Sequence, residues 1–194
     1  CDITPSMADS DLAKIGEDEG EPVTLCIAAE CTHENEPAVL LCVDSLAVLG
    51  DPAAGAASVT DTNKIRFVSK ESTLLIAGTL NSAEALVSAI GPAVKKYEAT
   101  NEEADSDIYV DGLIKTLKET TQARKVQVID EYFRISFGFS FEEFKQHGRD
   151  RFTESHYLGL WEDIKRLRLG AELIFVTFSG GEPVILRIDQ SGSV

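Results

Sequence analysis

Residues 22–45 read PVTLCIAAECTHENEPAVLLCVDS and set the pattern for the whole chain. The two apolar runs in this stretch, residues 23–30 and 38–43, are rich in small and branched side chains. Such runs are typical of strands that are buried on both faces. The residues between them, 32–37, are mostly polar and predict a turn. We therefore expect an antiparallel hairpin with Thr24 near its start and Asp44 at its end.

Two more hairpins are expected further along the chain. Their strands are short apolar runs separated by turn-forming residues, at residues 64–68 with 73–77 and at residues 173–178 with 184–188. The stretch 49–57, rich in Gly, Ala and Pro, is expected to be a loop.

Helices are predicted between the second and third hairpins, where apolar residues recur at helical spacing. Asn81 or Ser82 is expected to cap the first helix, and Pro92 is expected to kink or break it. Ser140, with Glu143 three residues later, predicts the cap of a short helix. Two longer helices are expected at residues 108–133 and 153–169.

The order of these elements predicts an α+β fold. Three hairpins with helices among them are most simply arranged as two stacked antiparallel sheets sandwiched by helices, a four-layer αββα architecture. We expect residues 22–194 to form this single domain. Residues 1–21 carry seven acidic side chains and one basic one, and we interpret them as a flexible leader.

Composition excludes several classes of function. The chain has 194 residues and a net charge of −15, from 33 acidic and 18 basic residues, whereas a nucleic-acid surface needs clustered Lys and Arg. No apolar stretch approaches the roughly 20 residues of a membrane helix, so no membrane partner is expected.

The four cysteines have no metal-ligand spacing and no secretory signal precedes them, which predicts a cytoplasmic protein without metal or cofactor. Cys26 and Cys42 are expected to be small buried apolar residues.

Thr24, Asp44 and Lys64 supply the groups of a hydrolase whose nucleophile is its own first residue. A free α-amine has a pKa of about 7.7–8, so a threonine at a chain terminus carries a nucleophile and a general base on one residue. A nearby ammonium would lower the pKa of that amine, and a carboxylate would hold the ammonium in place.

Five phrases of the sequence, taken in order, carry a family resemblance: VTLCIAAEC at 23–31, LLCVDS at 40–45, DTNKI at 61–65, LIAGTLNSAEAL at 75–86 and AELIFVTFSGGEPVILRID at 171–189. This order resembles the proteasome β-type superfamily of N-terminal nucleophile hydrolases. It is more similar still to bacterial proteasome-like proteins that open with Met-Thr-Val-Cys-Ile-Ala-Ala, in which removal of Met would expose the Thr.

The resemblance implies a role for each of four residues. Thr24 is the expected nucleophile, Asp44 and Lys64 are its electrostatic support, and the backbone N–H of Gly78 is the expected oxyanion donor. The resemblance also implies a peptide or amide substrate, a homo-oligomer that could be a ring, and a part of the domain beyond Val194.

Other interpretations of the same residues stay open. An uncut Thr24 has an amide nitrogen and no base, and is then an ordinary strand residue. Lys64 could be a surface residue at a strand start, Asp44 a capping residue, and Gly78 a plain turn glycine. At the level of the protein, the alternatives are a non-catalytic scaffold subunit of the same fold and a small-molecule amidase.

Overall fold

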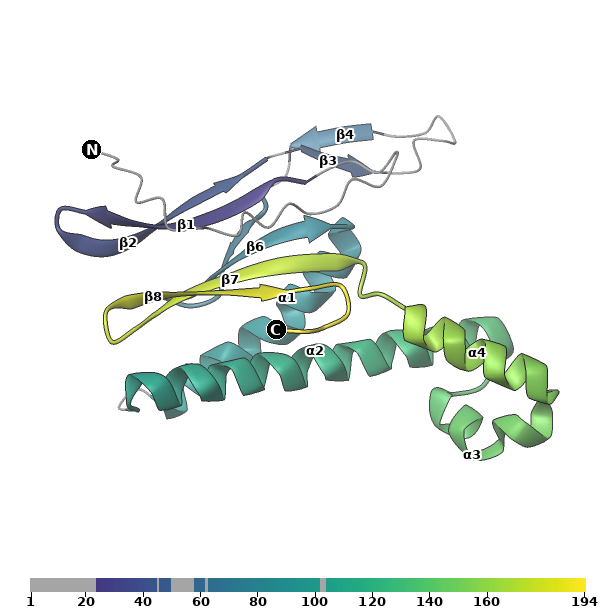
Figure 1. The fold of residues 1–194 in the computed structure, drawn as a ribbon. Coiled ribbons are helices and arrows are strands. Elements are labelled where there is room, and N and C mark those ends of the chain that lie inside the picture. Colours follow the sequence, from purple (N-terminus) through teal and green to yellow (C-terminus); the bar gives the residue numbers. More distant parts are fainter. Residues whose placement is uncertain (1–23, 45, 50–57, 62, 102–103) are drawn as a thin grey trace.

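A computed structural model describes residues 24–44, 46–49, 58–61, 63–101 and 104–194 of the chain (Figure 1). The predicted leader at 1–21, Val23 and Ser45 lie outside these residues. The described elements are, in order, β1 (Cys26–His33), β2 (Glu36–Val43), β3 (Leu46–Leu49), β4 (Ser58–Asp61), β5 (Ile65–Phe67), β6 (Thr73–Gly78), α1 (Leu80–Thr100), α2 (Ser106–Phe137), α3 (Phe141–Arg151), α4 (Glu154–Arg166), β7 (Ala171–Ser179) and β8 (Glu182–Ile188).

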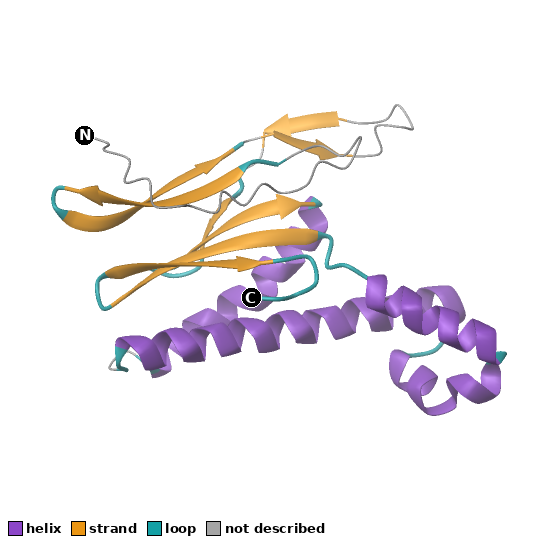
Figure 2. Ribbon diagram, viewed as in Figure 1, coloured by secondary structure: helices purple, strands orange, loops and turns teal. Residues whose placement is uncertain are grey.

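The strands and helices form layers, and every strand pair in the described part is antiparallel. One sheet has the order β5-β6-β7-β8, and β1 pairs with β2 and β3 with β4. Figure 2 shows the β1–β2 hairpin stacked over one face of the four-stranded sheet, with α1 and α2 against the other face. The α+β prediction is thus confirmed. The predicted fourth layer, a helix layer outside β1–β2, is not found among the described residues.

The first hairpin is longer and tighter than its sequence predicts. Its strands pair from Cys26 opposite Val43 to His33 opposite Glu36, which leaves a two-residue turn at Glu34 and Asn35. Both turn residues have positive φ, 53° and 67°, as a type I′ turn requires. This turn twists in the same sense as the strands, so the pairing continues through most of the stretch that was expected to be a six-residue turn.

The prediction that this hairpin is buried on both faces is wrong for the described structure. Leu25 is 54% exposed and Leu40 is 58% exposed, and Cys42 is exposed as well. An apolar run indicates that both faces of a strand can be buried. Whether the second face is buried depends on another element packing against it. Here only the inner side of the hairpin lies against the four-stranded sheet (Figure 1).

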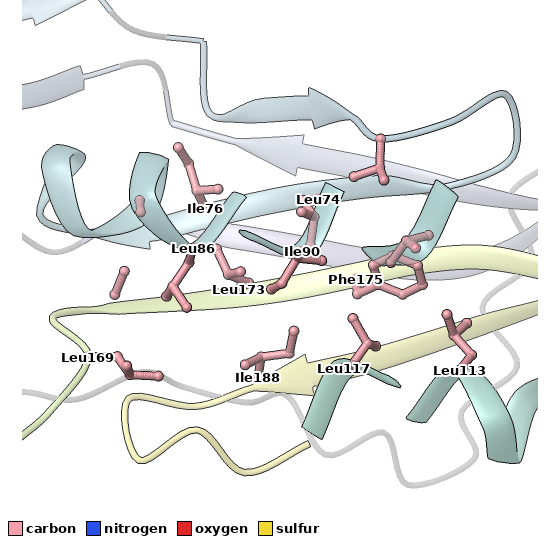
Figure 3. Close-up of a cluster of buried hydrophobic side chains, with 14 residues drawn as sticks. Leu74, Ile76, Leu86, Ile90, Leu113, Leu117, Leu169, Leu173, Phe175 and Ile188 are labelled. Carbon is pink, nitrogen blue, oxygen red and sulfur yellow. The ribbon is translucent and has the colours of Figure 1, made fainter. Parts of the chain in front are cut away.

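The main core lies between the four-stranded sheet and the two long helices (Figure 3). Leu74 and Ile76 of β6 meet Leu173 and Phe175 of β7 there, and Leu86 lies over them from α1. Side chains alternate along a strand, so Leu75 points to the other face, under the hairpin. Leu75 is fully buried too, so β6 is covered on both sides.

Helix α1 differs from its prediction at two points. It runs unbroken from Leu80 to Thr100 with Pro92 inside it. Its N-cap position is Thr79 rather than Asn81 or Ser82, and no side chain caps it. The Thr79 side chain is engaged elsewhere, because its hydroxyl donates to the carbonyl oxygen of Gly170 at 3.2 Å.

The end of α2 and the helices α3 and α4 form a helical extension with a core of its own. This extension projects beyond the edge of the sheets (Figure 1). Phe133, fully buried, lies within 6 Å, ring centre to ring centre, of five other aromatic rings: Tyr132, Phe137, Phe139, Phe141 and Phe144. Such tilted and edge-to-face pairs stabilise beyond their buried area.

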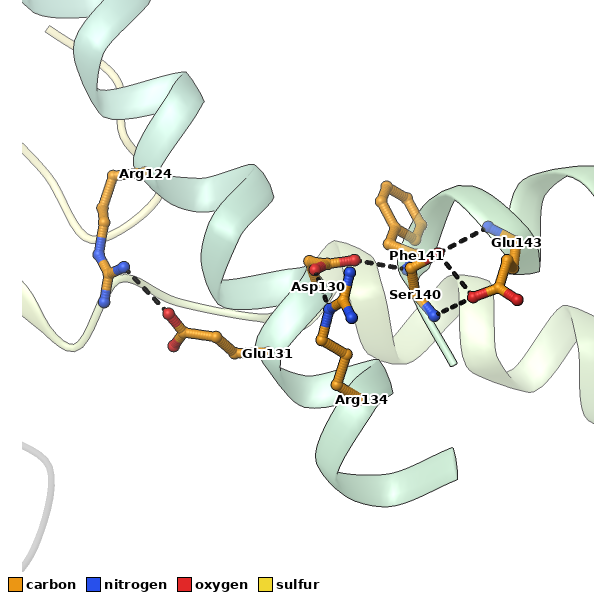
Figure 4. A network of polar contacts seen from close by, with 7 residues as sticks. All are labelled: Arg124, Asp130, Glu131, Arg134, Ser140, Phe141 and Glu143. Atoms are coloured by element: carbon orange, nitrogen blue, oxygen red, sulfur yellow. Dashed lines mark hydrogen bonds and ion pairs between the residues drawn. The ribbon is translucent and has the colours of Figure 1, made fainter. Parts of the chain in front are cut away.

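Polar contacts fasten α3 to α2 (Figure 4). Asp130 accepts from the backbone N–H of Phe141 at 2.8 Å and from the Arg134 guanidinium at 2.6 Å, and these bonds lower the pKa of its carboxyl group. Ser140 and Glu143 form the predicted capping box. The position where α3 begins is therefore determined by local side-chain bonds on the surface as well as by the aromatic core.

Candidate functional site

The hairpin places Thr24 and Asp44 beside each other. In an antiparallel pair the start of one strand lies next to the end of its partner, and the Asp44 N–H donates to the Leu25 carbonyl oxygen at 3.0 Å. Thr24 comes two residues before β1 and Asp44 directly follows β2. Lys64 comes from a different element, one residue before β5.

The Lys64 ammonium joins the three side chains. Its Nζ donates to Thr24 Oγ1 at 3.1 Å and to Asp44 Oδ1 at 2.8 Å. Lys64 is only 6% exposed, so the interpretation of this residue as a surface residue is wrong. A buried ammonium is stable only when paired and hydrogen-bonded, and Asp44 supplies the counter-charge. The structure thus brings together three of the four predicted site residues.

Backbone and thiol contacts tie this cluster to β6. The Ile76 N–H donates to the Lys64 carbonyl oxygen at 2.9 Å, and the Cys26 thiol donates to the Ile76 carbonyl oxygen at 3.4 Å. Burial raises the pKa of the Cys26 thiol to about 11, so the group stays protonated and acts as a donor. A thiolate nucleophile at this position is therefore disfavoured.

Cys26 has no assigned role in the sequence-based prediction, which treats it as a small apolar residue. One signal points to it: residues 24 and 26 are two positions apart, and alternate residues of a strand share a face. The sequence could not show which backbone oxygen this face meets, because Ile76 is 50 residues away.

Gly78 lies at the end of β6, two residues beyond Ile76, and its backbone explains why it is glycine. Its φ is +104°, a region that L side chains rarely adopt. A Cβ there would lie 2.6 Å from the carbonyl oxygen of Gly170 and 2.7 Å from Cα of Ala171. Both are backbone atoms, one in the first residue of β7 and the other in the residue before it. The role of the Gly78 N–H as an oxyanion donor remains a prediction.

Replacing Gly78 with alanine should destabilise the fold by about 2–4 kcal/mol, since it adds an unfavourable φ to a clash with fixed backbone. Urea denaturation followed by circular dichroism measures this change. Gly91→Ala is a suitable control, because a Cβ at Gly91 meets nothing within 4 Å and the position is helical, where alanine is favoured. A Gly78→Ala protein as stable as the parent would contradict this account of the glycine.

Cys31 and Cys42 are exposed free thiols, so the expectation of a buried Cys42 is wrong. Of the described residues, no three His, Cys, Asp or Glu side chains are grouped so that they could hold a metal ion.

No helix in the described part of the chain combines the length and apolar character needed to cross a membrane. No protein-family model matches the chain, and no curated protein matches it either.

Proposed function

We propose that the protein, when its chain begins at Thr24, hydrolyses amide bonds with Thr24 as nucleophile. The observation that carries this proposal is the 3.1 Å contact between the buried Lys64 ammonium and Thr24 Oγ1, with Asp44 as the counter-ion at 2.8 Å. Burying an ammonium is costly, and its placement beside a threonine hydroxyl supports a role of Lys64 in activating that hydroxyl.

The chemistry follows from the groups in contact. In a chain that starts at Thr24, the free α-amine accepts the proton of the Thr24 hydroxyl, and Oγ1 forms a bond to the carbonyl carbon of the substrate. The electron pair of the C=O π bond moves to the carbonyl oxygen, which becomes an oxyanion. The same amine, now protonated, gives its proton to the leaving nitrogen as the C–N bond breaks. Water then adds to the resulting ester and releases the acid. The Lys64 ammonium favours the developing alkoxide and lowers the pKa of the nearby amine.

This mechanism depends on the Val23–Thr24 bond. While the bond is intact, the nitrogen of Thr24 is an amide, which is not a base at neutral pH. The full chain of 194 residues is then expected to be inactive, and the chain beginning at Thr24 to be active.

The experiment compares the two forms directly. A cleavable tag that leaves Thr24 as the first residue yields the short form, and both forms are incubated with a panel of peptide aminocoumarin amides and with an electrophilic peptide β-lactone. Hydrolysis and a mass increase on Thr24, found only in the short form, are expected. A folded short form that neither hydrolyses the amides nor is acylated would overturn the proposal and favour a non-catalytic scaffold subunit.

The cytoplasmic location predicted from the cysteines and the homo-oligomeric assembly implied by the family resemblance are part of this proposal. Sedimentation of both forms measures the assembly independently of activity. A monomeric protein would remove the oligomeric part of the proposal and leave the chemistry at Thr24 to be decided by the hydrolysis experiment.

A further inference from the structure

Thr24, Asp44 and Lys64 contact one another through their side chains. These contacts include no backbone hydrogen bond between the β1–β2 hairpin and the four-stranded sheet. Thr24 belongs to the β1–β2 hairpin, whereas Lys64 is next to β5 in the other sheet. Two stacked sheets are joined by side-chain packing, which tolerates small shifts more readily than a hydrogen-bonded ladder. The ion pair of Lys64 with Asp44, at 2.8 Å, is one link across this gap, and a second link would hold the Thr24 hydroxyl against the Lys64 ammonium more tightly.

Ile76 contacts both sides of this gap through its backbone. Its N–H donates to the Lys64 carbonyl oxygen at 2.9 Å, and its carbonyl oxygen accepts from Cys26 Sγ at 3.4 Å. The β5–β6 pairing ends at Ile65 and Leu75, so Ile76 lies just beyond it. Its carbonyl oxygen is therefore placed to accept from the stacked hairpin.

We infer that Cys26 is a positioning residue for the proposed catalytic pair, holding Thr24 against Lys64 through the Ile76 carbonyl. The chain of contacts runs from Lys64 through the backbone of Ile76 to the Cys26 thiol. Thr24 precedes Cys26 by two residues, so a bond that holds the start of β1 also holds the segment that carries the Thr24 hydroxyl. The expected effect of Cys26 on catalysis rests on the proposed function. Its expected effect on the position of Thr24 relative to Lys64 does not.

Cys26 is suited to this position for physical reasons. It is partly buried between the sheets, where a thiol packs as a small apolar group and still provides a weak donor. Because the thiol stays protonated at neutral pH, its hydrogen bond persists across the range in which a terminal amine titrates.

Three variants separate the hydrogen bond from other effects. Cys26→Ala removes the donor, and Cys26→Ser restores an O–H donor of smaller size. Cys31→Ala is the matched control, since Cys31 is an exposed thiol five residues along the same strand and on its opposite face. All variants are made in the chain that begins at Thr24 and are compared at a temperature at which each is fully folded by circular dichroism.

The first readout does not need activity. Brief treatment with acetic anhydride acylates exposed amines, and peptide mass spectrometry gives the ratio of acetylated Lys64 to acetylated Lys70, which is exposed and serves as the internal standard. Cys26→Ala should raise this ratio about twofold, the factor that corresponds to loss of a hydrogen bond at the weak end of the usual range. Cys26→Ser and Cys31→Ala should match the parent.

The second readout is amide hydrolysis. Cys26→Ala should lower kcat about tenfold with little change in KM, less than the roughly hundredfold cost of a misplacement of about 1 Å. The midpoint of the acid limb of the pH–rate profile should rise, because the terminal amine lies farther from the ammonium. Cys26→Ser should restore both values.

The two proposals fail in different ways. If Lys64 acetylation in Cys26→Ala equals that of the parent, or if Cys26→Ser behaves like Cys26→Ala, the positioning role of Cys26 is overturned whether or not amides are hydrolysed. If Lys64 becomes more reactive in Cys26→Ala alone and no variant hydrolyses an amide, the positioning role stands and the proposed hydrolase function falls.

Discussion

Replacing Lys64 with methionine in the chain that begins at Thr24 should lower amide hydrolysis by about a hundredfold or more, as expected for removal of preorganised charge beside a reacting oxygen. Methionine keeps much of the length and apolar character of the side chain and removes the ammonium, which contacts Thr24 Oγ1 at 3.1 Å. The measurement is kcat/KM on the peptide amide cleaved best by the parent.

The pH–rate profile adds a second signature with a definite sign. A neighbouring positive charge disfavours protonation of the terminal amine, so removing Lys64 raises the pKa of that amine. The amine must be neutral to accept the hydroxyl proton, and the acid limb of the profile in Lys64→Met therefore shifts to higher pH. A merely structural role of Lys64 would lower the rate without this shift.

Lys70→Met is the matched control for this prediction. Lys70 lies six residues along the chain, is exposed, and follows β5, which Lys64 precedes. The same change of side chain at this position should leave both the rate and the pH profile unchanged. Equal activity of Lys64→Met and Lys70→Met would rule out electrostatic support of Thr24 by Lys64.

Replacing Phe133 with alanine should destabilise the protein by about 3–5 kcal/mol, the usual cost of deleting a buried aromatic ring. Phe133 is fully buried, and its ring packs with five others in the helical extension. The free energy of unfolding from guanidinium titration measures the effect.

The loss should be concentrated in the helical extension. That region has an aromatic core separate from the core beneath the sheet. In hydrogen exchange, the amides of α3 and α4 should lose protection in Phe133→Ala before those of β6 and β7. Phe67→Ala is the control: Phe67 is 80% exposed on the edge strand β5, and its loss should cost less than about 0.5 kcal/mol. Similar losses in the two variants would contradict the assignment of Phe133 as the centre of this core.

Local signals in the chain were predictive where a single element determines the outcome. The capping box at Ser140 and Glu143 formed as its spacing indicates, and the second and third hairpins appeared close to their expected positions. Predictions failed where another part of the chain competes. At the N-cap position of α1, Thr79 gives its hydroxyl to the Gly170 carbonyl oxygen instead of capping the helix.

Strands β3 and β4 show the same limit. The pair Leu46–Leu49 and Ser58–Asp61 begins at the edge of a stretch whose Gly, Ala and Pro residues favour a loop. Short strands of four residues give too little periodicity to stand out from such surroundings. Their pairing is a property of two segments together, which neither segment shows alone.

The sequence by itself determined most of the elements, though not β3 and β4, and their order. It also determined the residue types available for chemistry: a hydroxyl at 24, a carboxylate at 44 and an ammonium at 64, each near one end of a predicted strand. The tertiary structure alone decided that these groups meet, that Lys64 is buried, and that the Cys26 thiol reaches the carbonyl oxygen of Ile76. The physical reason is that the periodicity of the sequence indicates only which face of a strand is apolar. Which atoms that face contacts depends on how one sheet packs on the other.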